Sequence, residues 1–354
     1  MEPNQANPSR DAQRAAREAA LKRIRSAALP APDELANQLM AGNRVALGQA
    51  ITLIESQSAA DRPAADALLN RVLEVKHQAI RIGVTGVPGV GKSTFIEKWG
   101  LQLIEAGHRV AVLAVDPSSG RSHGSILGDK TRMTALSMHP AAFVRPSPAA
   151  EALGGVARAT REVMALCEAA GFDRILVETV GVGQSETAVR DLTDIFLLLL
   201  LPGAGDELQG IKRGIMEMAD LVWVNKADGE AAGRAVEAAN QIHSALHLLP
   251  PPISGETVEV FTGSGLTGLG LDELDSALSS LAERMIASGH LERQRTDQEL
   301  ASFDHHVRSG IWHSLLSRPE TAAEWQRLQT QVLHKQISPY SAARNFIEAV
   351  ASHV

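Results

Sequence analysis

The chain has 354 residues, which suits one large domain or one domain with appendages, and its formal net charge at pH 7 is −7. An acidic chain with 3% aromatic residues lacks both a general attraction for nucleic acid and stacking platforms for single strands, so we expect no nucleic-acid partner. The single cysteine, Cys167, excludes an intramolecular disulfide, fits a cytoplasmic location and is expected to be a small buried hydrophobe.

The first predicted elements are helices that form an N-terminal extension over residues 1–78. Apolar residues recur at helical spacing from residue 10 to about residue 78, and Pro30 and Pro32 separate a first helical stretch from a second. The positions with this spacing are Leu35, Leu39, Val45, Leu47, Ile51, Leu53, Ile54, Leu68, Leu69, Val72, Leu73 and Val75. We expect the extension either to dock against another chain or simply to pack on the core.

Short apolar strands alternate with helices between residues 79 and 270, which predicts one α/β domain. The predicted strands are Arg81–Gly86, Val110–Asp116, Ala142–Arg145, Arg174–Glu178, Asp194–Leu201, Leu221–Asn225 and Val258–Thr262. The predicted helices are Lys92–Ala106, Leu153–Ala170 and Glu230–His247. Runs of Val, Ile and Leu without polar alternation indicate a mostly parallel sheet flanked by helices, with its ligand at the carboxyl ends of the strands. These runs are too short to span a membrane, and no membrane partner is expected.

The segment after the first strand matches the GxxxxGK[ST] pattern of a P-loop NTPase, and it lies between a strand and a helix as that pattern requires. The nucleotide-binding residues predicted here are Gly86, Val87, Pro88, Gly89, Val90, Gly91, Lys92, Ser93 and Thr94. The glycines let main-chain amides surround phosphate oxygens, and the helix N-terminus adds partial positive charge. Lys92 should reach the β- and γ-phosphates, Ser93 should ligate Mg²⁺, and Thr94 should support the α-phosphate.

Three polar loops follow later strands and are expected to lie near the γ-phosphate and Mg²⁺. Asp116 opens the first loop and Asp129 lies within it, and both are candidate ligands of the metal or its water. Glu178 opens the second loop, where it should orient water around Mg²⁺, and Gly181 should let the main chain approach the γ-phosphate. The third loop, residues 202–207, is rich in glycine and acidic residues and is a further candidate mobile element.

The pattern Asn225-Lys226-Ala227-Asp228 ends the sixth predicted strand and indicates which base is bound. The Asp228 carboxylate can accept hydrogen bonds from N1–H and the 2-amino group of guanine, whereas adenine offers no such pair of donors. Asn225 would brace neighbouring loops, and the Lys226 stem would lie along the base. Further along, Ser264-Gly265-Leu266 stands where GTPases usually carry a Ser-Ala-x loop whose amide contacts guanine O6. The predicted ligand is therefore GTP or GDP.

Residues 271–354 are predicted to form a C-terminal helical extension. Its first helix has one apolar face made of Leu271, Leu274, Leu278 and Leu281, and further helices are expected near 290–317, 320–335 and 338–350. The last of these begins at Ser338-Pro339, a helix-start signal. This extension is expected to dimerise the chain or to pack on the core.

Five motifs in order resemble the MeaB/ArgK family of P-loop GTPases. They are Gly-Val-Pro-Gly-Val-Gly-Lys-Ser (86–93), Val-Asp-Pro-Ser-Ser (115–119), Gly-Ser-Ile-Leu-Gly-Asp-Lys-Thr-Arg-Met (124–133), Glu-Thr-Val-Gly-Val-Gly-Gln-Ser-Glu (178–186) and Gly-Asp-Glu-Leu-Gln-Gly-Ile-Lys (205–212). The resemblance covers most of residues 35–290. It implies a cytoplasmic, dimeric G-protein chaperone of an adenosylcobalamin-dependent acyl-CoA mutase, chiefly methylmalonyl-CoA mutase. GTP hydrolysis would be slow, stimulated by the mutase, and would gate cofactor loading and protect or reactivate that enzyme.

The same resemblance implies roles for individual residues. The phosphates and Mg²⁺ would be held by Lys92, Ser93, Asp116, Asp129 and Glu178. The loop from Asp206 to Lys212 would be a third switch that couples the mutase to the nucleotide, with Lys212 as its key residue. Adenosylcobalamin would belong to the partner mutase, an adenosyltransferase is a further candidate partner, and the C-terminal helices would form a homodimer.

Four features depart from the family pattern, among them the atypical run Gly120-Arg121-Ser122 and the unusual stretch of residues 259–266. His123 stands where the family usually has glycine, and Gly265 stands where it usually has alanine. A divergent branch could serve a related enzyme, such as isobutyryl-CoA, ethylmalonyl-CoA or 2-hydroxyisobutyryl-CoA mutase. The older family label of an ATP-dependent kinase for arginine or ornithine transport is disfavoured by the guanine pattern of residues 225–228.

Three other functions of a P-loop chain stay open at this point. A metallochaperone GTPase would carry clustered His or Cys ligands, whereas the 12 histidines here are scattered and the pair His305-His306 is expected to be solvated or packed. A small-molecule kinase would need an acceptor pocket with a catalytic base. A GTPase that targets membrane proteins would need a Met-rich groove, and the 8 methionines here are spread along the chain.

Overall fold

The computed structural model describes residues 29–56, 58, 60–74, 79–115, 133–145, 153–179, 185–202, 213–250, 252 and 254–351. Its contacts divide the chain into two units, Met1–Arg284 and Met285–Val354, which are described in turn.

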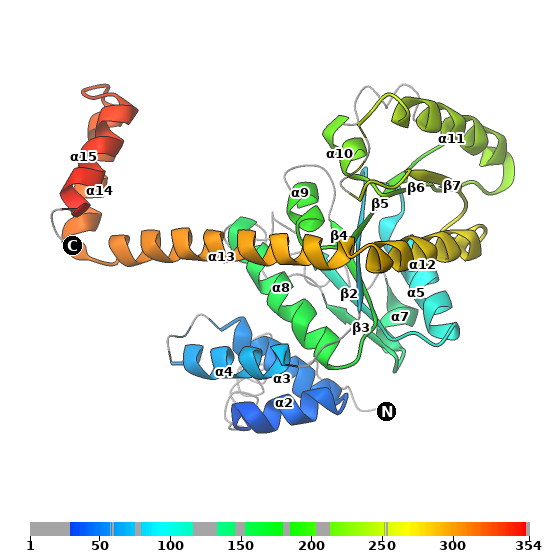
Figure 1. Ribbon diagram of the computed structural model, residues 1–354, viewed down its shortest axis with the longest axis horizontal. Helices are drawn as coiled ribbons and strands as arrows, with labels where there is room; N and C mark the ends of the chain where they lie inside the picture. Colours follow the sequence, from blue (N-terminus) through cyan, green and yellow to red (C-terminus); the bar gives the residue numbers. More distant parts are fainter. Residues whose placement is uncertain are drawn as a thin grey trace, which may run out of the picture. The chain divides into compact units, whose positions relative to one another are not determined.

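The first unit is built on one seven-stranded parallel sheet (Figure 1). Its strands are β1 (Ile80–Gly86), β2 (Val110–Val115), β3 (Ala142–Arg145), β4 (Arg174–Thr179), β5 (Ile195–Leu200), β6 (Leu221–Val224) and β7 (Glu259–Thr262). They follow the order β3-β2-β4-β1-β5-β6-β7, and every neighbouring pair is parallel. After β1 the chain continues to β2 and β3 on one side of β1, and after β5 it continues to β6 and β7 on the other side. Ligands bind at the carboxyl ends of strands where the order reverses in this way, here beside β1.

The sequence pattern explains why this sheet is buried on both faces. Every residue of β2 and of β5 is buried, as the unbroken apolar runs predict. Val84 of β1 pairs with Glu178 of β4 and Leu197 of β5, so Glu178 lies at the carboxyl edge of the sheet beside the end of β1. The predicted α/β fold with a mostly parallel sheet is confirmed, and all seven strands appear within a residue or two of their predicted bounds.

Helices cover both faces of the sheet (Figure 1). Those in the first unit are α5 (Lys92–Glu105), α7 (Thr134–Met138), α8 (Leu153–Ala169), α9 (Ser185–Arg190), α10 (Arg213–Met218), α11 (Ala232–Leu246) and α12 (Leu271–Ala287), whose last turn crosses into the second unit. A 3₁₀ turn, Gly229–Ala231, precedes α11. The short helices α7, α9 and α10 were not predicted from the sequence, because five or six residues give too little hydrophobic periodicity to detect.

The N-terminal extension packs on the core of the first unit. It forms α2 (Pro32–Met40), α3 (Arg44–Ile54) and α4 (Arg62–Leu73), which lie beside α8 (Figure 1). Asn43 caps α3 by accepting hydrogen bonds from the amides of Val45 and Ala46. Leu47 and Leu68 belong to the same buried cluster as Cys167 of α8. Of the two roles expected for this extension, packing on the core is the one that the described contacts show.

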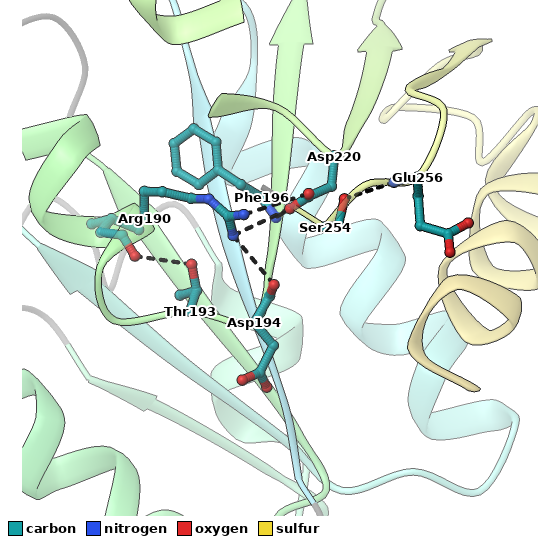
Figure 2. A network of polar contacts seen from close by, with 8 residues as sticks. Arg190, Thr193, Asp194, Phe196, Asp220, Ser254 and Glu256 are labelled. Atoms are coloured by element: carbon teal, nitrogen blue, oxygen red, sulfur yellow. Dashed lines mark hydrogen bonds and ion pairs between the residues drawn. The ribbon is translucent and has the colours of Figure 1, made fainter. Parts of the chain in front are cut away.

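A buried polar network lies at the amino ends of the central strands, opposite the ligand edge (Figure 2). The Arg190 guanidinium, at the end of α9, donates to the Asp194 carbonyl oxygen over 3.2 Å and pairs with the Asp220 carboxylate, also at 3.2 Å. Asp220 Oδ2 also accepts the amide of Phe196, and Asp194 Oδ2 accepts the amide of Arg81. The network therefore joins the end of α9 to the starts of β1, β5 and β6.

The second unit is helical, with α13 (His290–Leu316), α14 (Pro319–Leu333) and α15 (Pro339–Ala351). Its small core centres on Leu328 and Phe346, and the rings of Trp312 and Trp325 meet edge to face with centroids 4.7 Å apart. The predicted helix start at residue 338 is confirmed, because the Ser338 hydroxyl accepts the amide of Ser341 over 3.1 Å. Within the described ranges, no helix has the length and apolar character needed to cross a membrane.

Candidate nucleotide-binding site

The loop between β1 and α5 turns in a way that only glycine permits at two points. Gly86 ends β1, and a Cβ added there would lie 2.4 Å from the carbonyl oxygen of Leu199 on the neighbouring strand. Gly91 precedes α5 with φ of +93°, and a Cβ there would lie 3.1 Å from Nδ2 of Asn225. The loop thus folds tightly over the carboxyl end of β1 and leads its amides into the N-terminus of a 14-residue helix, as a phosphate cradle requires.

Lys92 is the first residue of α5 and folds back over this loop. Its Nζ donates to the carbonyl oxygen of Gly86 over 2.8 Å and to that of Val87 over 3.4 Å. Burial lowers the pKa of Lys92, while the nearby carboxylates of Glu178 and Glu186 act in the opposite direction. Phosphate oxygens at the loop would be favourable further partners for this buried ammonium, whose hydrogen bonds to Gly86 and Val87 go to neutral carbonyl oxygens.

Ser93 and Glu178 meet beside the same loop. The Ser93 hydroxyl donates to Oε1 of Glu178 over 2.9 Å, and Glu178 is buried at the end of β4. On the adjacent strands β1 and β4, the hydroxyls of Thr85 and Thr179 lie 2.9 Å apart. A hydroxyl and a carboxylate supply the oxygen ligands that Mg²⁺ prefers, with phosphate oxygens and waters completing its shell, so these residues fit a nucleotide-bound magnesium ion.

Asn225 joins the phosphate loop to the loop expected at the base. Its Nδ2 donates to the carbonyl oxygen of Val90 over 2.7 Å, and its Oδ1 accepts the amide of Gly265 over 2.8 Å. Lys226, with φ of +59°, donates from Nζ to the carbonyl oxygen of Gly89 over 2.9 Å. Asn225 therefore forms hydrogen bonds to both loops that it was predicted to brace.

Asp228 follows in extended backbone at the start of the 3₁₀ turn and is half-buried. Its carboxylate makes no capping bond within the described part of that turn. An acceptor with spare lone pairs at the carboxyl edge suits the predicted contact with guanine N1–H and the 2-amino group. This contact stays a prediction.

The segment Ser264-Gly265-Leu266 forms a tight turn over α5. The Ser264 hydroxyl accepts the amides of Leu266 and Thr267, each over 3.2 Å, and the Leu266 side chain is exposed. The departure at Gly265 has a physical cause, because a Cβ there would lie 2.8 Å from Cα and Cβ of Phe95. The contact of this loop with guanine O6 also stays a prediction, and in this structure the Gly265 amide donates to Asn225.

The described structure brings together most of the predicted site. Gly86 to Ser93, Glu178 and Asn225 to Asp228 meet around the ends of β1, β4 and β6, and Thr94 is exposed on the first turn of α5. The predicted residues Asp116, Asp129, Gly181 and Lys212, and the departure at His123, lie outside the described residues.

Two buried residues beside the site were not identified from the sequence. Glu186, near the start of α9, is buried, and its negative charge partly offsets the lowering of the Lys92 pKa by burial. Trp223 of β6 is fully buried and donates from its indole Nε1 to Oδ1 of Asn225 over 3.2 Å. Trp223 precedes Asn225 by two residues, so alternation along the strand could have placed the two side chains on one face.

Comparison with known proteins agrees with this geometry. The family described as "Methylmalonyl Co-A mutase-associated GTPase MeaB" matches residues 47–320. A Caulobacter vibrioides protein named as a GTPase is 52% identical over 317 residues, which cover 90% of this chain and 97% of the relative. The mitochondrial "methylmalonic aciduria type A homolog" of Mus musculus is 43% identical over 330 residues, covering 90% and 80% of the two chains. A crystal structure titled as a LAO/AO transport system kinase has a TM-score of 0.73 at 35% identity and covers 90% of this chain and 97% of its own. The chain therefore belongs to the MeaB family of P-loop GTPases.

Proposed function

We propose that this chain hydrolyses GTP and acts as a chaperone of an adenosylcobalamin-dependent acyl-CoA mutase. The observation that carries the proposal is the family match over residues 47–320, whose description names association with methylmalonyl-CoA mutase. The relative named for methylmalonic aciduria supports the same class of partner. The chain would gate loading of the mutase's adenosylcobalamin and protect or reactivate that enzyme, and an adenosyltransferase is a further candidate partner.

The chemistry at the nucleotide would be positioning and charge neutralisation. The amides of residues 86–93 would surround the phosphates, and Lys92 would leave its two carbonyl partners for phosphate oxygens. Ser93 and Glu178 would hold Mg²⁺, which when bound neutralises charge that develops on the phosphates. The hydrogen bond between these two residues places both oxygens at the end of β1. Asp116 and Asp129 are proposed as further ligands around the metal.

Base selection would come from the carboxyl ends of β6 and β7. Asp228 would accept the two guanine donors, and Asn225 would hold the base loop against the phosphate loop. The half-buried position of Asp228 supports this role, because a carboxylate left unpaired by adenine in a closed site would be costly.

Coupling to the mutase would run through the segments before α9 and α10. Glu178 to Gln184 lead into α9, and Asp206 to Lys212 lead into α10. Arg190 at the end of α9 pairs with Asp220, two residues beyond the end of α10, so the far ends of both helices are fixed in one place. We assign Lys212 the role of coupling mutase binding to the nucleotide, and this assignment rests on the family resemblance alone.

The second unit would form a homodimer. On α13 the exposed apolar residues Leu300, Phe303, Val307 and Ile311 follow spacings of three, four and four. Spacings of three and four residues produce the apolar seam by which two helices pack along each other. A second copy of this chain is the proposed occupant of that seam.

Stimulation of GTP turnover by a mutase tests the proposal. Purified chain would be mixed with purified methylmalonyl-CoA, isobutyryl-CoA, ethylmalonyl-CoA or 2-hydroxyisobutyryl-CoA mutase, and released phosphate would be followed. We expect one mutase to accelerate hydrolysis, and Lys212→Ala to lose the acceleration while it keeps the basal rate. If none of the four mutases, with or without adenosylcobalamin, changes the rate or binds the chain, the proposed partner class is wrong.

A further inference from the structure

The side-chain amide of Asn225 is held in one orientation by three hydrogen bonds. Oδ1 accepts from the Trp223 indole over 3.2 Å and from the Gly265 amide over 2.8 Å, while Nδ2 donates to the Val90 carbonyl oxygen over 2.7 Å. If the amide were rotated by 180°, its NH₂ group would face two donors and its oxygen would face a carbonyl oxygen. The three partners therefore fix which way Asn225 points.

Trp223 is the one of these three partners that bonds through its side chain, and the surrounding chain leaves space for its indole ring. Its ring lies 5.4 Å from that of Phe95 between centroids. A Cβ at Gly263 would lie 2.1 Å from Cη2 of the indole, and a Cβ at Gly270 would lie 3.2 Å from the same atom. Gly263 and Gly270 thus leave the space that the indole occupies.

We propose that Trp223 is a positioning residue for guanine-nucleotide binding. Its indole N–H orients the Asn225 amide, and through that amide it holds the base loop at Gly265 against the phosphate loop at Val90. Without this donor, Oδ1 would keep one partner, and both loops would lose part of their common anchor. The inference rests on the proposed role of Asn225 at the nucleotide and extends it to a residue that does not itself touch the ligand.

The rival explanation is that Trp223 only fills the core, and Trp99 provides the matched comparison. Trp99 of α5 is also fully buried and packs on Phe95, with ring centroids 5.5 Å apart. Its indole makes no hydrogen bond to Asn225 or to the phosphate loop within the described residues. Replacing either tryptophan by phenylalanine therefore removes similar buried area, but only one replacement removes the donor to Asn225.

The experiment compares Trp223→Phe, Trp99→Phe and Asn225→Ala for equilibrium binding of fluorescent GDP and ADP in Mg²⁺ buffer, with thermal unfolding measured alongside. We expect both tryptophan variants to lower the unfolding temperature. Only Trp223→Phe should weaken GDP binding, by about fivefold, the loss expected for one net hydrogen bond, and so narrow the preference for GDP over ADP. Equal losses in the two tryptophan variants, with the preference unchanged, would overturn the inference. If Asn225→Ala keeps full GDP affinity, the proposed base site itself fails.

A measurement on the unaltered protein covers the case in which Trp223→Phe does not fold. The chain has four tryptophans, so its indole N–H signals can be assigned by elimination from Trp99→Phe, Trp312→Phe and Trp325→Phe. The Trp223 signal should exchange slowly with solvent and should shift when GDP binds, because its acceptor lies in the nucleotide loops. A Trp223 signal that GDP leaves in place would contradict the inference.

Discussion

The Ser93 hydroxyl donates a 2.9 Å hydrogen bond to Oε1 of Glu178, and this bond joins the first turn of α5 to the end of β4. The register of the sheet makes this possible, because Glu178 pairs with Val84, two residues before the phosphate loop begins. Both oxygens therefore lie beside the end of β1. A bond that holds two ligand oxygens in place reduces the free-energy cost of ordering them around a metal ion.

We first predict that Ser93→Ala and Glu178→Gln weaken Mg²⁺-dependent GTP turnover without unfolding the chain. Ser93→Ala removes a ligand, and Glu178→Gln keeps the shape but removes the charge. Each should lower GTP turnover, or raise the Mg²⁺ concentration needed for half-maximal turnover, by about 10- to 100-fold. The control is Ser276→Ala on α12, whose hydroxyl donates to the carbonyl oxygen of Asp272 within the same helix. Magnesium titrations that match wild type in both variants would exclude these two residues from the metal site.

A second prediction concerns Gly265, where the contact with Phe95 leaves no room for a methyl group. Gly265→Ala should lower the free energy of unfolding by about 1–3 kcal/mol, because α5 must move to accommodate the methyl group. Gly48→Ala is the matched control, since Gly48 lies within α3 and a Cβ there would have no atom within 4 Å. That replacement should raise stability by about 0.5–1 kcal/mol. Denaturant unfolding of the two variants checks the signs, and a stabilised Gly265→Ala would refute the steric explanation.

The Arg190–Asp220 pair supplies a third prediction. The exposed fraction of the Arg190 side chain is 5% and that of Asp220 is 0%, so removing one partner leaves a buried charge (Figure 2). Arg190→Met should therefore cost about 3–5 kcal/mol of unfolding free energy. Adding Asp220→Asn, which keeps an acceptor for the Phe196 amide, should recover part of the loss. Strictly additive losses in denaturant unfolding of the two single variants and the double variant would contradict this.

A fourth prediction is that Cys167 does not react in the folded chain. Burial is the main cause that raises the pKa of this thiol, and the neighbouring Glu168 adds to the shift. A raised pKa keeps the thiol protonated at pH 8 to 9, where an ordinary cysteine begins to ionise, and the thiolate is the reactive form. Iodoacetamide should label the chain at pH 8.5 only as fast as it unfolds, and fully in denaturant. Rapid labelling of native protein would show that the thiol is accessible.

The sheet and the phosphate loop could be predicted from the sequence because their signals are local. Strands such as Ile195–Leu200 are continuous apolar runs, and the loop pattern fixes the order of strand, glycines, lysine and helix. The order of the strands in the sheet could not be read this way, because pairing between β1 and β4 joins segments about 90 residues apart. The short helices α9 and α10 carry too few turns for a periodic signal.

The departures in the base loop show a second limit of sequence reasoning. Gly265 weakened the match to the usual loop pattern when considered by itself. In the structure it accommodates Phe95, and Gly263 accommodates Trp223, so the aromatic residues and the glycines are complementary. A single sequence does not show such pairs, because the contacts join residues that are distant in the chain.

Guanine selection is the most direct test of the central claim, which is that the loop after β1 binds Mg²⁺-bound nucleotide while Asp228 chooses the base. Labelled GDP would be bound to purified chain in Mg²⁺ buffer and challenged with ATP. We predict that wild type retains GDP against at least about a 100-fold excess of ATP, and that Asp228→Asn loses much of this preference. If the wild-type chain retained no guanine nucleotide, or if Asp228→Asn discriminated against ATP as well as wild type does, the central claim would be wrong.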